Sequence, residues 1–198
     1  MLSESMRKSL EAKARSCEER VEEVLPYLAG RGIEAATAHT FRLGAGTGDY
    51  VGRLAIPYIT ADGSVVDIRY RALSPDQSPR YMSMPGSKTH LYSVSSLLAD
   101  GDTLFLTEGE IDCITLNQLG VPAVGVPGAK NWKPHYRLLM EDYDRVVVLC
   151  DGDQAGREFG REVAERVDGV ELVHLPDGTD VNSLWCDRPE ELLKVVGL

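Results

Sequence analysis

Two aspartates separated by one glycine follow an apolar run in the stretch VVVLCDGDQAG, where they are Asp151 and Asp153. Neighbouring carboxylates repel each other, so their ionised forms cost free energy unless a cation or a proton lies between them. The pair therefore suits a metal site, or a nucleophilic aspartate assisted by a second aspartate as acid or base.

The elements that must position this pair alternate between short apolar runs and helical segments from Asp102 onward. The predicted strands are TLFLT, VPAVGV, RVVVLC and VELVHL, and the predicted helices are EIDCITLNQLG, a segment around WKPHYRLLM, and AGREFGREVAERV. Strands that alternate with helices are typical of a parallel sheet with helices on its faces. We therefore predict an α/β fold for this part of the chain.

A third carboxylate, Glu108, follows the first of these strands, and the aspartate pair follows the third. Ligands of open parallel sheets bind outside the carboxyl ends of the strands, so Glu108, Asp151 and Asp153 are expected at one sheet edge. Asp112 lies one helical turn beyond Glu108. After the last strand, LPDGTDVNSL adds Asp177 and Asp180 at the same edge.

The predicted ligand set contains only carboxylate oxygens, which suit Mg²⁺ or Mn²⁺ and not zinc. The candidate metal ligands are Glu108, Asp112, Asp151, Asp153, Asp177 and Asp180. Asp153 is also expected to cap the helix that begins near Ala155. Gly156 and Gly160, four residues apart, would let that helix approach the sheet closely.

Three alternatives remain open for the DGD stretch. An EF-hand would need a ligand where Ala155 stands and a helix before the loop, and the sequence predicts neither. A phosphatase with Asp151 as nucleophile and Asp153 as acid or base would leave Glu108 without a role. The third alternative is a sheet edge whose carboxylates only contact solvent.

The first part of the chain has a different pattern. Apolar residues at helical spacing predict an amphipathic helix that ends near Pro26: Leu10, Ala14, Cys17, Val21, Val24 and Leu28. Asp62-Gly63 lies between two β-rich runs and predicts a hairpin. The segment SPDQSPRYMSMPGSK is expected to be a long loop. We predict a smaller α+β subdomain over residues 1–101 and the α/β domain over residues 102–198.

Charge and composition limit the range of functions that the chain can have. The chain has 198 residues and a formal charge of −10, yet residues 51–90 hold five basic and three acidic residues. A basic surface beside an acidic pocket suits an enzyme that brings a polyanion to metal ions. The sequence contains no apolar run long enough to cross a membrane and no secretory signal, which indicates a cytoplasmic protein. The four scattered cysteines indicate neither a zinc site nor disulfides.

With these residues placed, FLTEGEIDCITL followed by VVVLCDGDQAG resembles the Toprim domain. Bacterial-type DNA primases, topoisomerases, recombination mediators and some nucleases share this domain. Glu108 matches the conserved glutamate of the family, and Asp151 and Asp153 match its DxD pair. The resemblance implies a Toprim-like parallel sheet and catalytic roles for these three carboxylates.

The first half is similar to the N-terminal part of the polymerase core of bacterial and phage-type DNA primases. The segments that carry this similarity are YLAGRGI, FRLGAG, GRLAIPYITADGSVVDIRYRAL and SPRYMSMPGS. VPGAKNW resembles a loop of phage-type primases. The DNA-binding or nucleotide-binding residues expected from this similarity and from the basic region are Arg53, Arg69, Arg71, Arg80, Tyr81, Lys88 and Lys130.

The resemblance implies a DNA primase catalytic core that makes short RNA primers on single-stranded DNA from nucleoside triphosphates, by Mg²⁺-dependent nucleotidyl transfer. A Toprim-type nuclease and a non-catalytic DNA-binding replication subunit are the alternatives. The zinc module and the helicase-binding domain of many primases have no counterpart in the sequence. We therefore expect a replicative helicase or a separate zinc-binding subunit as partner, or else relaxed choice of start site. A phage-encoded chain would act in the host cytoplasm.

Overall fold

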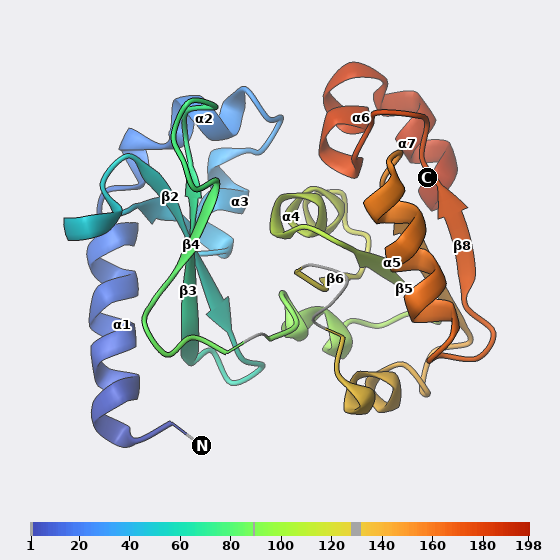
Figure 1. Ribbon diagram of the computed structural model, residues 1–198, viewed down its shortest axis with the longest axis horizontal. Helices are drawn as coiled ribbons and strands as arrows, with labels where there is room; N and C mark the ends of the chain where they lie inside the picture. The colour runs from blue at the N-terminus through green and yellow to red at the C-terminus, as the bar shows by residue number, and fades with distance from the viewer. Residues whose placement is uncertain (1, 89, 128–131) are drawn as a thin grey trace. The chain divides into compact units, whose positions relative to one another are not determined.

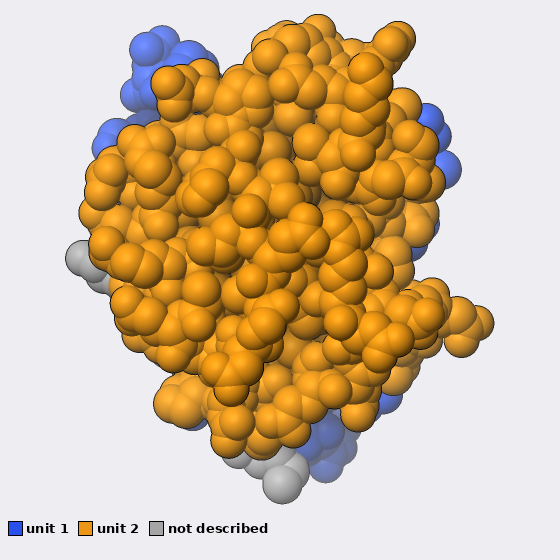
Figure 2. Space-filling model, turned by 90° about the vertical axis from the view of Figure 1, so that its right-hand side faces the viewer, with its two compact units in different colours: residues 1–88 blue, residues 89–198 orange. Residues whose placement is uncertain are grey.

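The computed structural model describes residues 2–88, 90–127 and 132–198. The chain forms two compact units, residues 1–88 and residues 89–198, which Figure 2 shows in blue and orange. Residues 89–101 were predicted to belong to the first part. In the structure Leu91 belongs to a hydrophobic core of unit 2, and Tyr92 forms a β-bridge with Gly125, so this segment packs with the second unit.

Unit 1 contains an antiparallel sheet in the order β1-β2-β3-β4. Its strands are Gly44–Ala45, Arg53–Ile59, Val65–Ala72 and Tyr81–Ser83. The predicted hairpin is confirmed, because β2 and β3 pair across a turn in which Gly63 has a φ of 83°. The strand β4 falls in the segment that was predicted to be a loop.

Helix α1, Glu4–Glu18, packs against one face of this sheet (Figure 1). The prediction of one helix as far as Pro26 was wrong, because α1 is followed by a 3₁₀ turn, Val21–Glu23, and by a short helix α2, Leu25–Ala29. Pro26 lies in the first turn of α2, where its missing N–H costs no hydrogen bond. The periodic apolar residues are nevertheless all buried. Helix α3, Ala35–Thr40, and a 3₁₀ turn, Gly48–Tyr50, complete the unit.

Unit 2 contains the predicted parallel sheet, in the order β6-β5-β7-β8. Its strands β5 to β8 are Thr103–Thr107, Ala123–Gly125, Arg145–Cys150 and Glu171–His174. The helices α4 to α7 are Glu110–Gln118, Gln154–Ala164, Val181–Asp187 and Pro189–Val196. Two 3₁₀ segments are Val94–Leu98 and Pro134–Leu139, and the second replaces the helix predicted around WKPHYRLLM. The α/β fold class is confirmed.

Helices cover both faces of this sheet. Phe159 and Val163 of α5 join a core cluster with alternate residues of the strands, such as Leu104, Leu106 and Val148. Helix α4 packs on β5 and β6. The crossover from β5 leads to β6 on one side and the crossover from β7 leads to β8 on the other, so right-handed connections put α4 and α5 on opposite faces. The strand order therefore reverses between β5 and β7, which is the topological switch point of the sheet.

Among the described residues, no helix is long and apolar enough to cross a membrane.

Candidate active site

Glu108 and Asp151 stand directly after the two strands that flank the switch point. Strands β5 and β7 are hydrogen-bonded neighbours, with Leu106 opposite Val148. Both carboxylates are half-buried. Because ligands of doubly wound sheets bind in the crevice at the switch point, these two side chains occupy the expected place for a functional site.

The electrostatics of the site show that five carboxylates interact. Burial, followed by the charges of Asp153 and Asp112, raises the pKa of Glu108 to about 7. Burial also raises the pKa of Asp151 to about 9, together with the charges of Asp112, Glu108, Asp180 and Asp153. We call Glu108, Asp112, Asp151, Asp153 and Asp180 the acidic cluster. Asp112 and Asp153 make ionisation of both Glu108 and Asp151 harder, and Asp180 makes ionisation of Asp151 harder, as expected for neighbouring like charges.

Two oxygens of the cluster fit a divalent cation. Oε1 of Glu108 and Oδ1 of Asp151 are buried and have no hydrogen-bond partner within the described residues. A buried carboxylate oxygen without a hydrogen-bond partner destabilises the folded state, and a bound hard cation such as Mg²⁺ would remove this cost. No three His, Cys, Asp or Glu side chains of the described residues are yet arranged to hold an ion.

The loop that carries the aspartate pair is held by backbone contacts. Gly152 N donates to the carbonyl of Thr179 at 2.8 Å, and Gly178 N donates to the carbonyl of Gly152 at 2.8 Å. A Cβ at position 152 would lie 1.9 Å from the carbonyl oxygen of Pro176. Only glycine fits between these two loops, so the DGD loop and the loop after β8 are fixed against each other.

Asp153 is the N-cap of α5, as predicted, since its Oδ1 accepts a hydrogen bond from Gly156 N at 2.8 Å. A Cβ at Gly156 would lie 2.2 Å from the carbonyl oxygen of Asp151. Gly160 is equally confined, because a Cβ there would lie 2.3 Å from Sγ of Cys150. The close approach predicted from these two glycines is confirmed, and it sets the first turn of α5 directly against Asp151.

The remaining predicted ligands differ in their surroundings. Asp112 is buried, and its Oδ1 accepts a hydrogen bond from Asn182 N at 3.0 Å. Asp180 is the N-cap of α6, since its Oδ1 accepts a hydrogen bond from Ser183 N at 2.6 Å. The charge of Asp180 also raises the pKa of Asp151. The side chain of Asp177 is fully exposed, and its nearest cation is Arg157 at 4.0 Å. The structure thus brings Asp112 and Asp180 into the acidic cluster and leaves Asp177 outside it.

Asn182 is a part of the site that the sequence analysis did not identify. Its Nδ2 donates to Oγ1 of Thr115 at 3.0 Å, while its backbone N–H binds Asp112. This residue therefore ties the first turn of α6 to the acidic face of α4. No sequence signal indicated Asn182, because a single amide residue that follows a helix cap does not form part of a recognisable motif.

The EF-hand alternative does not fit this geometry. Glu162, which would be the last ligand of a calcium loop, lies inside α5, and its carboxylate pairs with Arg166 at 3.5 Å. The residues of the supposed loop are mostly helical, so they cannot wrap around one ion.

Three of the predicted DNA-binding side chains gather on one face of the unit 1 sheet. Arg69 and Arg71 are two residues apart on β3, and Arg71 lies opposite Tyr81 of β4. The guanidinium carbons of Arg69 and Arg71 lie 4.2 and 5.4 Å from the centre of the Tyr81 ring. Arg71 also donates to the Tyr81 hydroxyl at 2.6 Å. This arrangement orients an aromatic ring beside two cations, which suits base stacking next to a phosphate strand.

The other predicted DNA contacts are more dispersed. Arg53 is buried and donates to the carbonyl of Pro79 at 2.7 Å, and its register places it on the opposite face of the sheet from Arg71. Arg80 and Lys88 are exposed. Lys130 lies outside the described residues.

The four-stranded parallel sheet with carboxylates at its switch point agrees with the Toprim-like sheet that the sequence resemblance implied. The family model described as Toprim-like matches residues 105–185. The gene 57 protein of Mycobacterium phage D29 is 45% identical over 148 residues, which cover 73% of this chain and 97% of that protein. The DNA primase of Clostridium acetobutylicum is 29% identical over 140 residues, which cover 65% of this chain and 23% of the primase.

Solved structures agree in fold. The RNA polymerase domain of the Mycobacterium tuberculosis primase DnaG matches with a TM-score of 0.80 at 21% identity, over 99% of this chain and 84% of that domain. A DnaG primase catalytic domain bound to single-stranded DNA matches with a TM-score of 0.77 at 20% identity, over 96% of this chain and 80% of that domain. The chain belongs to the Toprim-domain family and is a homologue of the DNA primases. It spans about a quarter of the length of the Clostridium primase.

Proposed function

We propose that this chain is the catalytic core of a DNA primase, which joins nucleoside triphosphates into a short RNA primer on a single-stranded DNA template. The observation that supports this most is the pair of unpartnered carboxylate oxygens, on Glu108 and Asp151, at the switch point of a primase-core fold. The related catalytic domain that was solved with single-stranded DNA supports the choice of template.

In this proposal Glu108 and Asp151 hold Mg²⁺ or Mn²⁺, and Asp153, Asp112 and Asp180 add negative charge around it. A bound divalent ion lowers the pKa of an attacking 3′-hydroxyl and neutralises charge on a pyrophosphate leaving group. Asp153 keeps its cap on α5 and so holds the DGD loop at the end of β7. Asp112, fixed by Asn182 N, holds the acidic face of α4 in place.

The basic part of unit 1 is proposed to hold the template. The exposed side chains of Arg80 and Lys88 contact phosphates, and Tyr81 stacks on a base with Arg69 and Arg71 beside its ring. Arg53 serves this surface indirectly by fixing the carbonyl of Pro79 next to Arg80. Lys130 is proposed as a further phosphate contact. A replicative helicase or a zinc-binding subunit completes the proposed set of partners.

One assay tests the proposal. Single-stranded DNA, labelled ribonucleoside triphosphates and Mg²⁺ are incubated with the chain, and the products are separated by length. The expected result is short labelled RNA, which disappears in the variant with Asp151→Asn and Asp153→Asn. Cleaved DNA in place of RNA would identify a nuclease, and neither RNA nor cleaved DNA would favour a non-catalytic binding subunit.

A second experiment tests the template surface. Tyr81→Ala is expected to weaken binding of single-stranded DNA by about 1–3 kcal/mol, the usual contribution of one stacked base. Tyr81→Phe keeps the ring but removes the hydroxyl that accepts from Arg71, so its loss should be smaller. Equal losses in the two variants would show that the ring does not stack on a base.

A further inference from the structure

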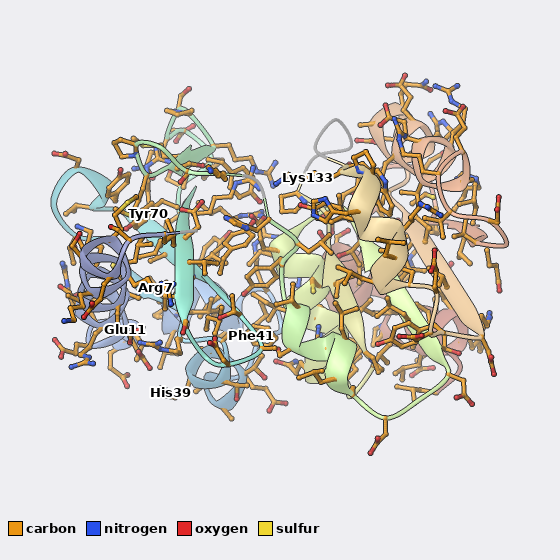
Figure 3. All side chains as sticks on the ribbon, turned by 90° about the horizontal axis from the view of Figure 1, so that it is seen from below. Arg7, Glu11, His39, Phe41, Tyr70 and Lys133 are labelled. Carbon is orange, nitrogen blue, oxygen red and sulfur yellow. The ribbon has the colours of Figure 1, made fainter. Side chains whose placement is uncertain are left out.

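A second basic surface of unit 1 lies on α1, apart from the residues that the sequence analysis assigned to DNA. A groove of about 430 Å³ runs between α1 and the start of β3. Its lining residues are Arg7, Lys8, Glu11, Ala12, Arg15, Ser64 and Val65. Figure 3 labels Arg7 and Glu11 on α1, beside the sheet of this unit.

The lining of the groove has an excess of positive charge. Arg7, Glu11 and Arg15 follow one another at intervals of four and therefore share one face of α1. Arg7 and Arg15 are exposed, and neither has an ion pair within the described residues. Lys8 pairs with Glu4 at 2.7 Å, but both side chains are largely exposed, so the pair is weak.

The carboxylates near the groove are already engaged elsewhere. Arg42 donates two hydrogen bonds to Glu11, at 2.7 and 3.3 Å, and these lower the pKa of Glu11. Asp62 in the hairpin turn accepts hydrogen bonds from Thr60 Oγ1 at 2.5 Å and from Ser64 N at 3.2 Å. Glu11 also interacts with Arg15, but less strongly than with Arg42, so it neutralises Arg15 only in part. The groove therefore presents two exposed guanidinium groups to an anion.

The spacing of these two cations favours a strand over a single phosphate. Arg7 and Arg15 are eight residues apart on α1, which corresponds to about 12 Å along the helix axis. This separation exceeds the size of one phosphate group, so the two guanidinium groups can contact different phosphates of one strand. Ala12 and Val65 are small, which leaves room for a sugar-phosphate backbone between the cations.

We propose that this α1 groove, formed by Arg7 and Arg15 with Ser64 at its rim, binds the phosphate backbone of a nucleic-acid strand as a second contact. The groove provides this acidic chain with an additional binding contact to its template or primer strand. The proposal rests on the proposed function for the identity of the strand. The binding itself requires neither metal nor synthesis, and this separates the two tests.

The experiment measures binding of a labelled single-stranded oligothymidylate by fluorescence anisotropy, in EDTA, at several salt concentrations. The test variant combines Arg7→Gln with Arg15→Gln. The control combines Arg161→Gln on α5 with Lys194→Gln on α7, which changes the net charge by the same amount at exposed helical positions of unit 2. Thermal unfolding is recorded for both variants, and both are expected to keep the wild-type midpoint because all four side chains are exposed.

Loss of two phosphate contacts should reduce the magnitude of the slope of log affinity against log salt concentration by about 1.4, since each contact to a single strand contributes about 0.7. The control should keep the wild-type slope. An unchanged slope in the test variant, or an equal change in the control, would overturn the proposal.

Primer synthesis is measured in parallel. If wild type makes no primers but its DNA binding depends on Arg7 and Arg15, the proposed function fails and the α1 groove stands. If primers are made and the test variant binds DNA with the wild-type slope, the groove proposal fails and the function stands.

Discussion

At the scale of single residues, the protonation of the acidic cluster connects stability with metal binding. Glu108 and Asp151 have pKa values raised to about 7 and about 9, above those of the same groups in an unfolded chain. A carboxyl group with a raised pKa keeps its proton in the folded state while the unfolded chain loses it. Its contribution to stability is therefore complete below about pH 4 and is lost as the pH rises through the folded value.

The first prediction is that the metal-free protein becomes steadily less stable from about pH 4 to about pH 9, the range between the unfolded and the folded pKa values of the two groups. Asp151→Asn removes one of the two titrating groups, so this variant should be more stable than wild type at pH 8.5 in EDTA, by about 1–3 kcal/mol. Chemical denaturation at pH 6 and pH 8.5 checks this. Equal pH dependence of the two proteins would show that Asp151 ionises without cost.

Metal addition gives the second prediction. Protons compete with a cation for the same oxygens, so Mg²⁺ should raise the melting temperature of wild type more at pH 8.5 than at pH 6. Asp151→Asn should lose most of this increase at both pH values. The same Mg²⁺ effect in wild type and variant would place the ion elsewhere on the chain.

Asp153 has two roles that substitution can separate, and this is the third prediction. Asparagine caps helices about as well as aspartate, so Asp153→Asn should keep the stability of α5 while removing a charge from the cluster. Asp153→Ala should lose the hydrogen bond to Gly156 N as well, at a cost of about 1 kcal/mol. Primer synthesis should fall strongly in both variants, and denaturation should distinguish them. Full activity of Asp153→Asn would reduce Asp153 to a helix cap.

At the scale of elements, close contact between α5 and the end of β7 holds Asp151 in place. The fourth prediction is that Gly156→Ala destabilises the protein by about 1–3 kcal/mol and lowers primer synthesis, because the new Cβ would displace the backbone of Asp151. Gly30→Ala is the matched control. A Cβ at Gly30 would lie 3.5 Å from its nearest atoms, and the φ of Gly30 is −63°. The control should be neutral or slightly stabilising, and a similar loss in both variants would contradict the close-contact explanation.

The elements also show which features the sequence could predict. Apolar runs such as RVVVLC match strand β7, and Asp62-Gly63 matches the hairpin turn, because local periodicity and turn chemistry specify them. Strand β4 was missed because only its ladder with β3 makes Tyr81–Ser83 a strand inside a Pro-rich and Ser-rich segment. The break after Glu18 was missed because a 3₁₀ turn followed by a short helix keeps the same buried residues as one continuous helix.

The candidate site was predictable to a similar degree. Carboxylates that follow strands of a parallel sheet meet at one edge whatever the strand order, so Glu108 and Asp151 could be placed from the sequence. The order β6-β5-β7-β8, which makes these two strands neighbours, depends on packing between distant segments. The burial of Arg53 could not be predicted either, because its hydrogen bond to the carbonyl of Pro79 depends on the conformation of a loop that is distant in sequence.

At the scale of the whole molecule, the formal charge of −10 must be reconciled with a polyanionic template. An evenly charged acidic surface would repel DNA, so binding has to depend on local basic surfaces. Unit 1 has two of them: the β3–β4 surface with Arg69, Arg80 and Lys88, and the α1 groove with Arg7 and Arg15. Arg53 is buried and Arg71 donates a hydrogen bond to Tyr81, so we expect these two arginines mainly to stabilise the fold.

The fifth prediction follows from this count of phosphate contacts. The five cations of unit 1 give an expected slope of about −3.5 for log affinity against log salt, since each contact to a single strand contributes about 0.7, and a contact from Lys130 would steepen it further. Titrations between about 50 and 300 mM salt, in EDTA, measure it. Arg80→Gln with Lys88→Gln should flatten the slope by about 1.4, whereas Arg53→Gln should lower thermal stability and leave the slope nearly unchanged, because its guanidinium is bound to a backbone carbonyl. A wild-type slope shallower than about −1 would mean that the basic surfaces of unit 1 do not hold the strand, and that this acidic chain needs a partner to bind its template.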